Sequence, residues 1–170
     1  MTPAIRALGL ALLLAIGLAA TASAQEPQVI GTFRDWKAYV YQSGNQKVCY
    51  MASSPKKAEG NYSSRGKIWM LITRRSPGPK DVVSIITGYN YKTDSSVRVS
   101  IGSGNFSLFT QGDTAWTRDV SDDASMVAAM KAGVDMVVVG TSERGTETRD
   151  TYSLLGFTAA YDAIRQACTN

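Results

Sequence analysis

The 170-residue sequence predicts a mainly β, single-domain protein with two short helices, the second of them at the C-terminus. Three observations support this class. Most of the chain after Phe33 consists of short runs in which apolar and polar residues alternate, bounded by glycine- or proline-containing turns. Two segments instead carry the signals of a helix. No internal repeat or interior linker interrupts the chain. Many short strands with frequent turns are typical of a sandwich or a barrel, and the pattern favours neither.

The first 24 residues have the pattern of a secretory signal peptide. Arg6 gives a short basic region, residues 7–20 are apolar, and Ala22-Ser23-Ala24 is a small-residue cleavage site before Gln25. The apolar stretch is short for a membrane anchor, which is the alternative interpretation. We therefore expect a cleaved signal at 1–24 and one domain at 25–170. The mature chain is expected to be periplasmic and to have no transmembrane segment, with surface association or secretion as alternatives.

Strands are expected in the first half of the mature chain at residues 35–41, 47–53, 67–75 and 82–92. In the first of these, Trp36, Ala38 and Val40 occupy alternate positions, as a half-buried strand requires. The third, KIWMLITRR, is apolar on both faces, which is typical of a central buried strand. The intervening SPKKAEGNYSSRG has the composition of a loop.

The second half alternates strands with two helices. Residues 97–101 have the clearest period of two, and the turn GSGN leads into a partner strand at 106–112. A helix is expected to begin at Ser121 and to end near Gly133, because serine is a good N-cap and acidic residues follow it. A strand, a turn and a second strand are expected between this helix and the terminal helix.

The apolar stripe of the terminal helix ends at a cysteine. The stripe consists of Phe157, Ala160, Tyr161, Ile164 and Cys168. Export would place Cys168 and the only other cysteine, Cys49, in an oxidising compartment, where they allow one intramolecular bridge. A metal site or a redox-active thiol is the alternative, but the chain has no histidine and no C-x-x-C pair. We expect a structural disulfide that holds the helix to the strand containing Cys49.

The composition removes several classes of function. Without histidine, the chain cannot form a Ser-His-Asp or Cys-His catalytic site, nor most zinc or copper sites. Asp122 and Asp123 are explained by their position at a helix start. The mild positive charge comes from scattered pairs rather than a stripe, so no nucleic-acid partner is indicated. We expect no catalytic residues, no enzymatic activity, no cofactor and no metal.

Two groups of residues are candidate binding sites. The polar loop after Gly140 is a candidate partner-binding loop, against the simpler interpretation as a solvated turn. Its candidate residues are Glu143, Arg144, Thr146 and Arg149. The second group could contact a ligand, although such aromatic residues more often anchor a core. It consists of Tyr89, Tyr91 and Trp116.

The segments DW, VCYM and AAMKAGVDMVVVGTSERGTETRDTYSLLGFTAAYDAIRQAC resemble the invasion-associated locus B family of exported alphaproteobacterial proteins. The most specific features are Met130 to Gly133 entering a strand, Gly140 to Thr146, and the strand and helix from Asp150 to Cys168. The resemblance implies an immunoglobulin-like β-sandwich and a bridge between the two cysteines. The resemblance identifies no catalytic or ligand-binding residues in this sequence.

The function expected from residues and resemblance together is that of a non-enzymatic periplasmic or cell-envelope protein. It would bind an envelope protein partner and act in host-cell invasion or envelope maintenance. The alternative is a periplasmic protein that binds a small molecule or a glycan.

Overall fold

The computed structural model describes residues 26–169, so the expected signal peptide and its cleavage site lie outside the described residues. The described chain forms these elements: β1 (Gln28–Phe33), β2 (Trp36–Ser43), β3 (Gln46–Ser53), β4 (Lys57–Gly60), β5 (Trp69–Ser76), β6 (Val82–Ile86), β7 (Ser96–Ile101), β8 (Gly104–Gln111), β9 (Thr114–Trp116), α1 (Val120–Ala132), β10 (Asp135–Thr141), β11 (Glu147–Ser153) and α2 (Phe157–Ala167). The expected mainly β class, with two helices and the last at the C-terminus, is confirmed.

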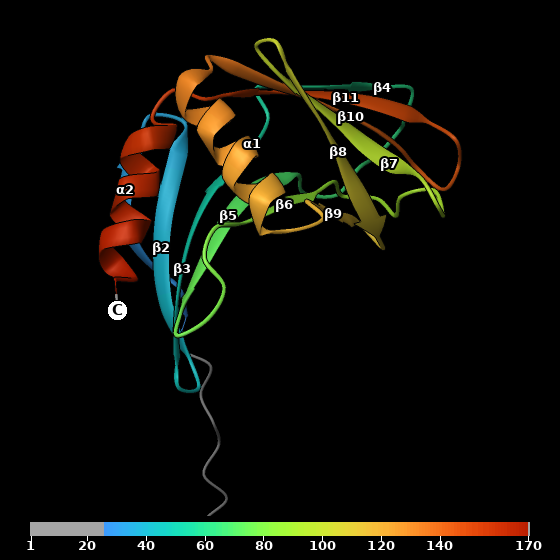
Figure 1. Ribbon diagram of the computed structural model, residues 1–170. Helices are drawn as coiled ribbons and strands as arrows, with labels where there is room; N and C mark the ends of the chain where they lie inside the picture. The colour runs from blue at the N-terminus through green and yellow to red at the C-terminus, as the bar shows by residue number, and fades with distance from the viewer. Residues whose placement is uncertain (1–25, 170) are drawn as a thin grey trace, which may run out of the picture.

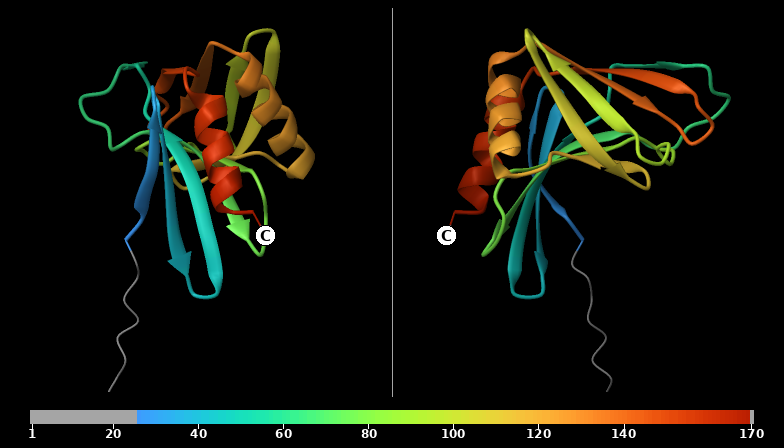
Figure 2. Two further views of the ribbon diagram at one scale, coloured as in Figure 1. Left: turned by 90° about the vertical axis from the view of Figure 1, so that its left-hand side faces the viewer. Right: turned by 45° about the vertical axis from the view of Figure 1, so that its right-hand side comes forward.

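The strands form one antiparallel sheet in the order β1-β2-β3-β5-β6-β9-β8-β7-β10-β11-β4. The sheet bends, so that β2 and β3 run down one side of the molecule while β7, β10 and β11 extend sideways from it (Figure 1, Figure 2). In an immunoglobulin-like sandwich the two layers are separate sheets. Here the layers are two arms of one sheet, because β6 pairs with β9 and continues the hydrogen bonding between them.

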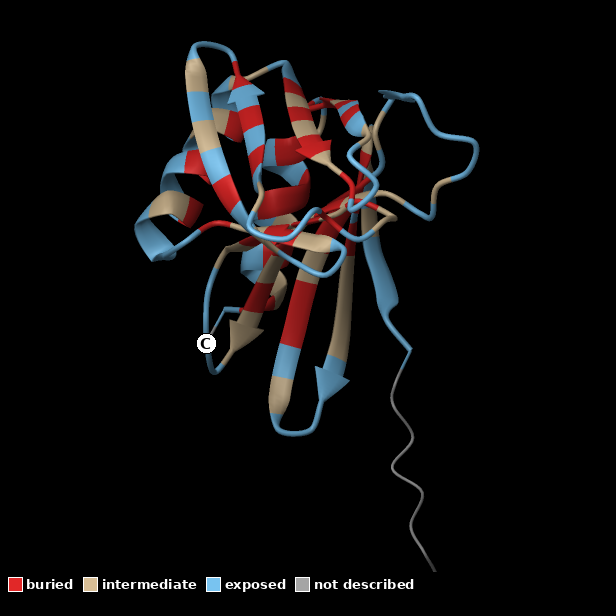
Figure 3. Ribbon diagram, turned by 90° about the vertical axis from the view of Figure 1, so that its right-hand side faces the viewer, coloured by how far each residue is buried: buried red, intermediate tan, exposed pale blue. Residues whose placement is uncertain are grey.

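One hydrophobic core joins both arms and both helices. The apolar stripe of α2 faces β2 and β3, and the ring of Trp36 packs edge-on against Phe157 at 5.0 Å between centroids. The Trp36 indole Nε1–H donates to the carbonyl oxygen of Ser153 at 3.1 Å, which links β2 to the end of β11. Buried residues gather where the arms and helices meet, and the tip of the β2–β3 hairpin is exposed (Figure 3).

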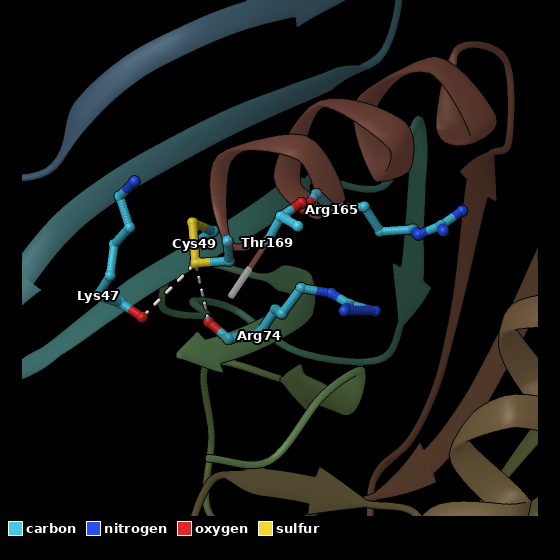
Figure 4. The surroundings of a disulfide bond; sticks show 6 residues. Lys47, Cys49, Arg74, Arg165 and Thr169 are labelled. Atoms are coloured by element: carbon cyan, nitrogen blue, oxygen red, sulfur yellow. Dashed lines mark hydrogen bonds between the residues drawn. A yellow bond between two sulfur atoms is a disulfide. The ribbon is translucent and has the colours of Figure 1, made fainter. Parts of the chain in front are cut away.

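A disulfide joins Cys49 of β3 to Cys168, the residue after α2 (Figure 4). Both cysteines are buried. The Cys168 Sγ atom lies 3.5 Å from the carbonyl oxygen of Lys47 and 3.8 Å from that of Arg74. These are packing contacts, because an oxidised sulfur carries no hydrogen to donate. The end of α2 is thus attached covalently to the sheet face on which its apolar stripe packs.

Several element boundaries differ from the sequence expectation. β1 and β9 were not expected, and β4 lies inside the segment 54–66 that was expected to be a loop. All four β4 residues are exposed, so no alternation marks the strand; it forms because its backbone pairs with β11. Helix α1 begins at Val120 rather than after Ser121, because the Asp119 carboxylate caps it by accepting the backbone N–H groups of Ser121 and Asp122.

Gly156 allows the chain to enter α2 against the turn between β1 and β2. Its φ is +90°, and a Cβ atom there would lie 2.0 Å from the carbonyl oxygen of Phe33. We expect Gly156→Ala to lower the free energy of unfolding by about 2–3 kcal/mol, from left-handed backbone strain and forced displacement. Gly102 has a φ of +56° and open space, so Gly102→Ala should cost only about 1 kcal/mol. Urea unfolding of both variants tests this, and equal losses would contradict it.

Candidate functional site

A hollow of about 460 Å³ lies between the segment 61–65 and the turn 142–146 that joins β10 to β11. We call it the polar groove. It is lined by Asn61, Tyr62, Ser63, Ser64, Arg65, Tyr89, Asn90, Ser142, Glu143, Arg144, Thr146 and Thr148. Hydroxyl and amide side chains predominate, and two tyrosines supply the aromatic surface.

Hydrogen bonds fix the turn on one side of the polar groove. The backbone N–H of Ser142 donates to the Thr146 carbonyl at 2.9 Å, and the Thr146 N–H donates to the Ser142 hydroxyl at 3.1 Å. The N–H of Glu143 donates to the carbonyl of Asn90 at 2.9 Å, which ties the turn to the neighbouring segment. The side chains of Glu143 and Arg144 are exposed on this held backbone.

Arg65 fastens the other side of the groove to the sheet. Its Nη1 and Nη2 donate to the two carboxylate oxygens of Asp150 on β11, at 2.7 and 2.6 Å. Its Nε donates to the carbonyl of Thr87 at 2.6 Å, and Nη2 also donates to the Thr87 hydroxyl at 2.7 Å. The Arg65 and Asp150 side chains are only 4% and 2% exposed. This buried, two-pronged ion pair therefore holds the segment 61–65 in place.

The two tyrosines of the groove pack on this ion pair. The guanidinium of Arg65 lies 4.9 Å from the ring centroid of Tyr89 and 5.7 Å from that of Tyr62. The hydroxyls of Tyr89 and Thr148 are 2.6 Å apart and share a hydrogen bond. Burial disfavours the charged form of Arg65, but the hydrogen bonds and charge of Asp150 outweigh it, so the pKa of Arg65 is raised. At the floor of the groove the charges of Arg65 and Asp150 therefore cancel, and the exposed charges lie at the rim, on Glu143 and Arg144.

The structure brings together only part of each candidate group. Glu143, Arg144 and Thr146 line the polar groove, whereas Arg149 is exposed on another surface, beside Val139 in the sheet. The expected partner-binding loop therefore contributes three of its four residues to this groove.

The candidate aromatic residues do not share a cleft. Tyr89 lines the polar groove, but Tyr91 is 4% exposed and belongs to the core, where burial raises its pKa. Trp116 lies elsewhere, stacked on Phe109 with 5.7 Å between ring centroids. The Tyr91 ring packs edge-on against Tyr89 from the core side, at 5.4 Å between centroids, and the second aromatic residue that lines the groove is Tyr62, which is 37% exposed.

One wall of the groove is not predictable from the sequence. Residues 61–65 were interpreted as part of a loop, and no motif marks them. A signal did exist for Asp150: it occupies an inward position of β11 between buried Thr148 and Tyr152. A carboxylate at such a position requires a buried partner. The sequence alone does not say that the partner is Arg65.

Two structural findings bear on other classes of site. Among residues 26–169, no cluster of three or more histidine, cysteine, aspartate or glutamate side chains is placed to hold a metal ion. Over the same part of the chain, no helix has the length and apolar character needed to cross a membrane.

Fold and groove together define a disulfide-linked, mainly β domain with a polar groove held by hydrogen bonds on both sides. The family model described as "Invasion associated locus B (IalB) protein" matches residues 36–165. The chain belongs to this family. Both walls of the polar groove and the Arg65–Asp150 ion pair lie within the matched region. Neither the curated proteins nor the solved structures include a match to the chain.

Proposed function

We propose that the chain is a non-enzymatic protein of the bacterial cell envelope that binds a protein partner through the polar groove. The observation that carries this proposal is the convergence of the segment 61–65 and the turn 142–146 on one rigid surface. A pre-organised surface loses little conformational entropy when a partner binds. The exposed Glu143 and Arg144 at the rim offer opposite charges that can select and orient a partner.

The interior chemistry of the groove favours binding over catalysis. The Asp150 carboxylate is held by both prongs of Arg65 and is buried, so it is engaged as a structural group. The exposed carboxylate of Glu143 has no histidine to work with, because the sequence contains none. These features favour a binding protein, and the match to the invasion-associated locus B family suggests that its role is in envelope maintenance or host-cell invasion.

Two features of the sequence support an envelope location. Residues 1–24 have the pattern of a cleaved export signal, and a chain with a Cys49–Cys168 disulfide suits an oxidising compartment. Cell fractionation and N-terminal sequencing test this part directly: a periplasmic protein that begins at Gln25 is the expected result.

The binding proposal is tested by photocrosslinking in intact cells. A photoreactive residue is placed at Arg144 on the groove rim, and a control probe is placed at Lys57 on the exposed edge strand β4. We expect a discrete protein adduct from position 144 that is absent from position 57, identified by mass spectrometry. If both positions give the same adducts or none, the groove is not a protein-binding site.

A small-molecule or glycan ligand is the second candidate. The lining favours it in one respect: Tyr62 and Tyr89 lie among serine, threonine and asparagine side chains, which suit a polyhydroxylated ligand. In that case Tyr62→Ala would weaken retention on a glycan affinity matrix, while the probe at position 144 would give no protein adduct.

A further inference from the structure

We propose that a second, cation-rich hollow beside the disulfide binds a phosphate group. This hollow has a volume of about 430 Å³ and lies between β5, the loop after β5 and the end of α2. It shares no lining residue with the polar groove, and the inference does not depend on the function proposed for that groove.

The lining is rich in hydrogen-bond donors. Arg74, Lys80 and Arg165 supply positive charge and Gln166 supplies an amide, whereas the Thr169 hydroxyl donates to the Arg165 carbonyl. Asp162 is the one carboxylate among the lining residues, and its oxygen lies 3.8 Å from Arg165, at the outer limit of an ion pair. The hollow therefore has an excess of positive charge and of donors.

Arg74 is the buried member of this group. Its side chain is 11% exposed, and Nη2 lies 2.8 Å from a carboxylate oxygen of Asp81. The other oxygen of Asp81 accepts the hydroxyl of Tyr161 at 2.7 Å. The Nε–H of Arg74 is buried and has no hydrogen-bond partner within the described chain. A buried donor without an acceptor is costly, and an anion that enters far enough to accept from the Nε–H would offset that cost.

Cations from three elements converge around Tyr161. The guanidinium groups of Arg74 and Arg165 lie 6.0 and 5.9 Å from its ring centroid, and the Lys131 ammonium of α1 lies 3.8 Å from it. Figure 4 shows the side chains of Arg74 and Arg165 projecting in the same direction from β5 and α2. Asp81 pairs with Arg74 and Asp162 lies 3.8 Å from Arg165, so two carboxylates stand against four cations, with Lys80 and Lys131 as the other two. The gathered positive charge creates a local field that attracts an anion.

The C-terminal end of α2 carries the negative end of the helix dipole, so the cations of the hollow must outweigh it for an anion to bind. The Cys168 N–H donates to the carbonyl of Ile164 at 3.0 Å, and the Thr169 hydroxyl donates to the carbonyl of Arg165 at 2.8 Å. These carbonyls of the last turn are therefore already engaged. The hollow is lined by the guanidinium groups of Arg74 and Arg165 and by the ammonium of Lys80. Such a set suits a tetrahedral oxyanion, because each oxygen can accept several charge-assisted hydrogen bonds.

Calorimetric titration of inorganic phosphate into the mature chain, at constant ionic strength set with chloride, tests the site. We expect one saturable site. Arg165→Gln and Lys80→Gln should each weaken the affinity about tenfold, because each removes one charge-assisted contact. Both positions are exposed, and Arg74 is left in place to hold Asp81. Lys92→Gln removes one charge from an exposed position outside the hollow, so it should leave the affinity unchanged.

Vesicle flotation separates the two sources of phosphate. If the group belongs to a lipid, phosphatidylglycerol vesicles should carry the wild-type chain and release it on Arg165→Gln, while phosphatidylcholine vesicles carry neither. If the ligand is soluble, inorganic phosphate binds and neither vesicle does. The proposal is overturned if neither probe binds, or if Lys92→Gln weakens binding as much as Arg165→Gln.

Discussion

Arg65→Met is expected to lower the free energy of unfolding by about 3–5 kcal/mol, because it leaves the buried carboxylate of Asp150 without its cation. Thr87 would also lose the guanidinium hydrogen bonds to its carbonyl and hydroxyl oxygens. Urea unfolding, followed by tryptophan fluorescence, measures the loss.

Two further variants separate charge from geometry. Arg65→Lys keeps the positive charge but cannot reach both oxygens of Asp150 with a planar fork, so we expect a loss between those of wild type and Arg65→Met. Asp150→Asn removes the carboxylate and leaves the arginine charge buried. The double variant Arg65→Met, Asp150→Asn contains no buried charge at this position, so its loss should be clearly smaller than the sum of the single losses.

The same variants report on the polar groove. Because Arg65 holds the segment 61–65 against β11, Arg65→Met should also increase amide hydrogen exchange in that segment more than in the hairpin β7–β8. Two results would contradict the view that the Arg65–Asp150 pair holds the segment 61–65 in place. One is a loss of stability below about 1 kcal/mol for both Arg65→Met and Asp150→Asn, and the other is a strictly additive loss in the double variant.

Loss of the disulfide is expected to lower stability by about 2–5 kcal/mol. The bridge closes a loop between positions 119 residues apart, so breaking it releases a large part of the chain in the unfolded state. The double variant Cys49→Ala, Cys168→Ala is the cleanest test, since it leaves no reactive thiol and places no hydroxyl in the buried site. The measurement is the urea midpoint of this variant beside that of oxidised wild type.

A second measurement locates the effect. Reduction of the wild-type protein should lower the midpoint to near that of the alanine variant, and should leave the variant itself unchanged. Amide exchange should rise most in α2, because the bridge attaches its C-terminal end to β3. An unchanged midpoint in both experiments would show that packing of Phe157, Ala160 and Ile164 alone holds the helix.

The elements that the sequence predicted well are those whose own residues carry the pattern. In β7, Val97, Val99 and Ile101 are buried and the residues between them are exposed, as their alternation indicates. In α2, the predicted stripe from Phe157 to Cys168 is buried. Such patterns are visible in the sequence because the periodicity is defined by apolar residues. Their exposure to water is unfavourable, so the face that carries them is buried.

The strands that the sequence missed depend on partners far along the chain. β4 has four exposed residues and forms through backbone pairing with β11. β9 has only three residues, too few for a period of two to be evident. The joining of two arms into one sheet depends on this short strand, so the sequence pattern did not decide between a sandwich and a barrel.

The polar groove was predicted in part for a related reason. Glu143, Arg144 and Thr146 were found because polar residues crowd between two strands. Tyr89 and Tyr91 are two residues apart and would share a face in a regular strand, but β6 ends at Ile86. Beyond that point alternation no longer decides direction, and only Tyr89 reaches the groove.

The sequence by itself determined the mainly β class, the two helices and the likeness to the invasion-associated locus B family. Each of these depends on local periodicity, capping residues or matched segments. Only the tertiary structure decided that the segment 61–65 meets the turn 142–146, and that Arg74 and Arg165 share a hollow. Both hollows are formed by residues distant in sequence, and local patterns hold no information about which distant segment a polar side chain will meet.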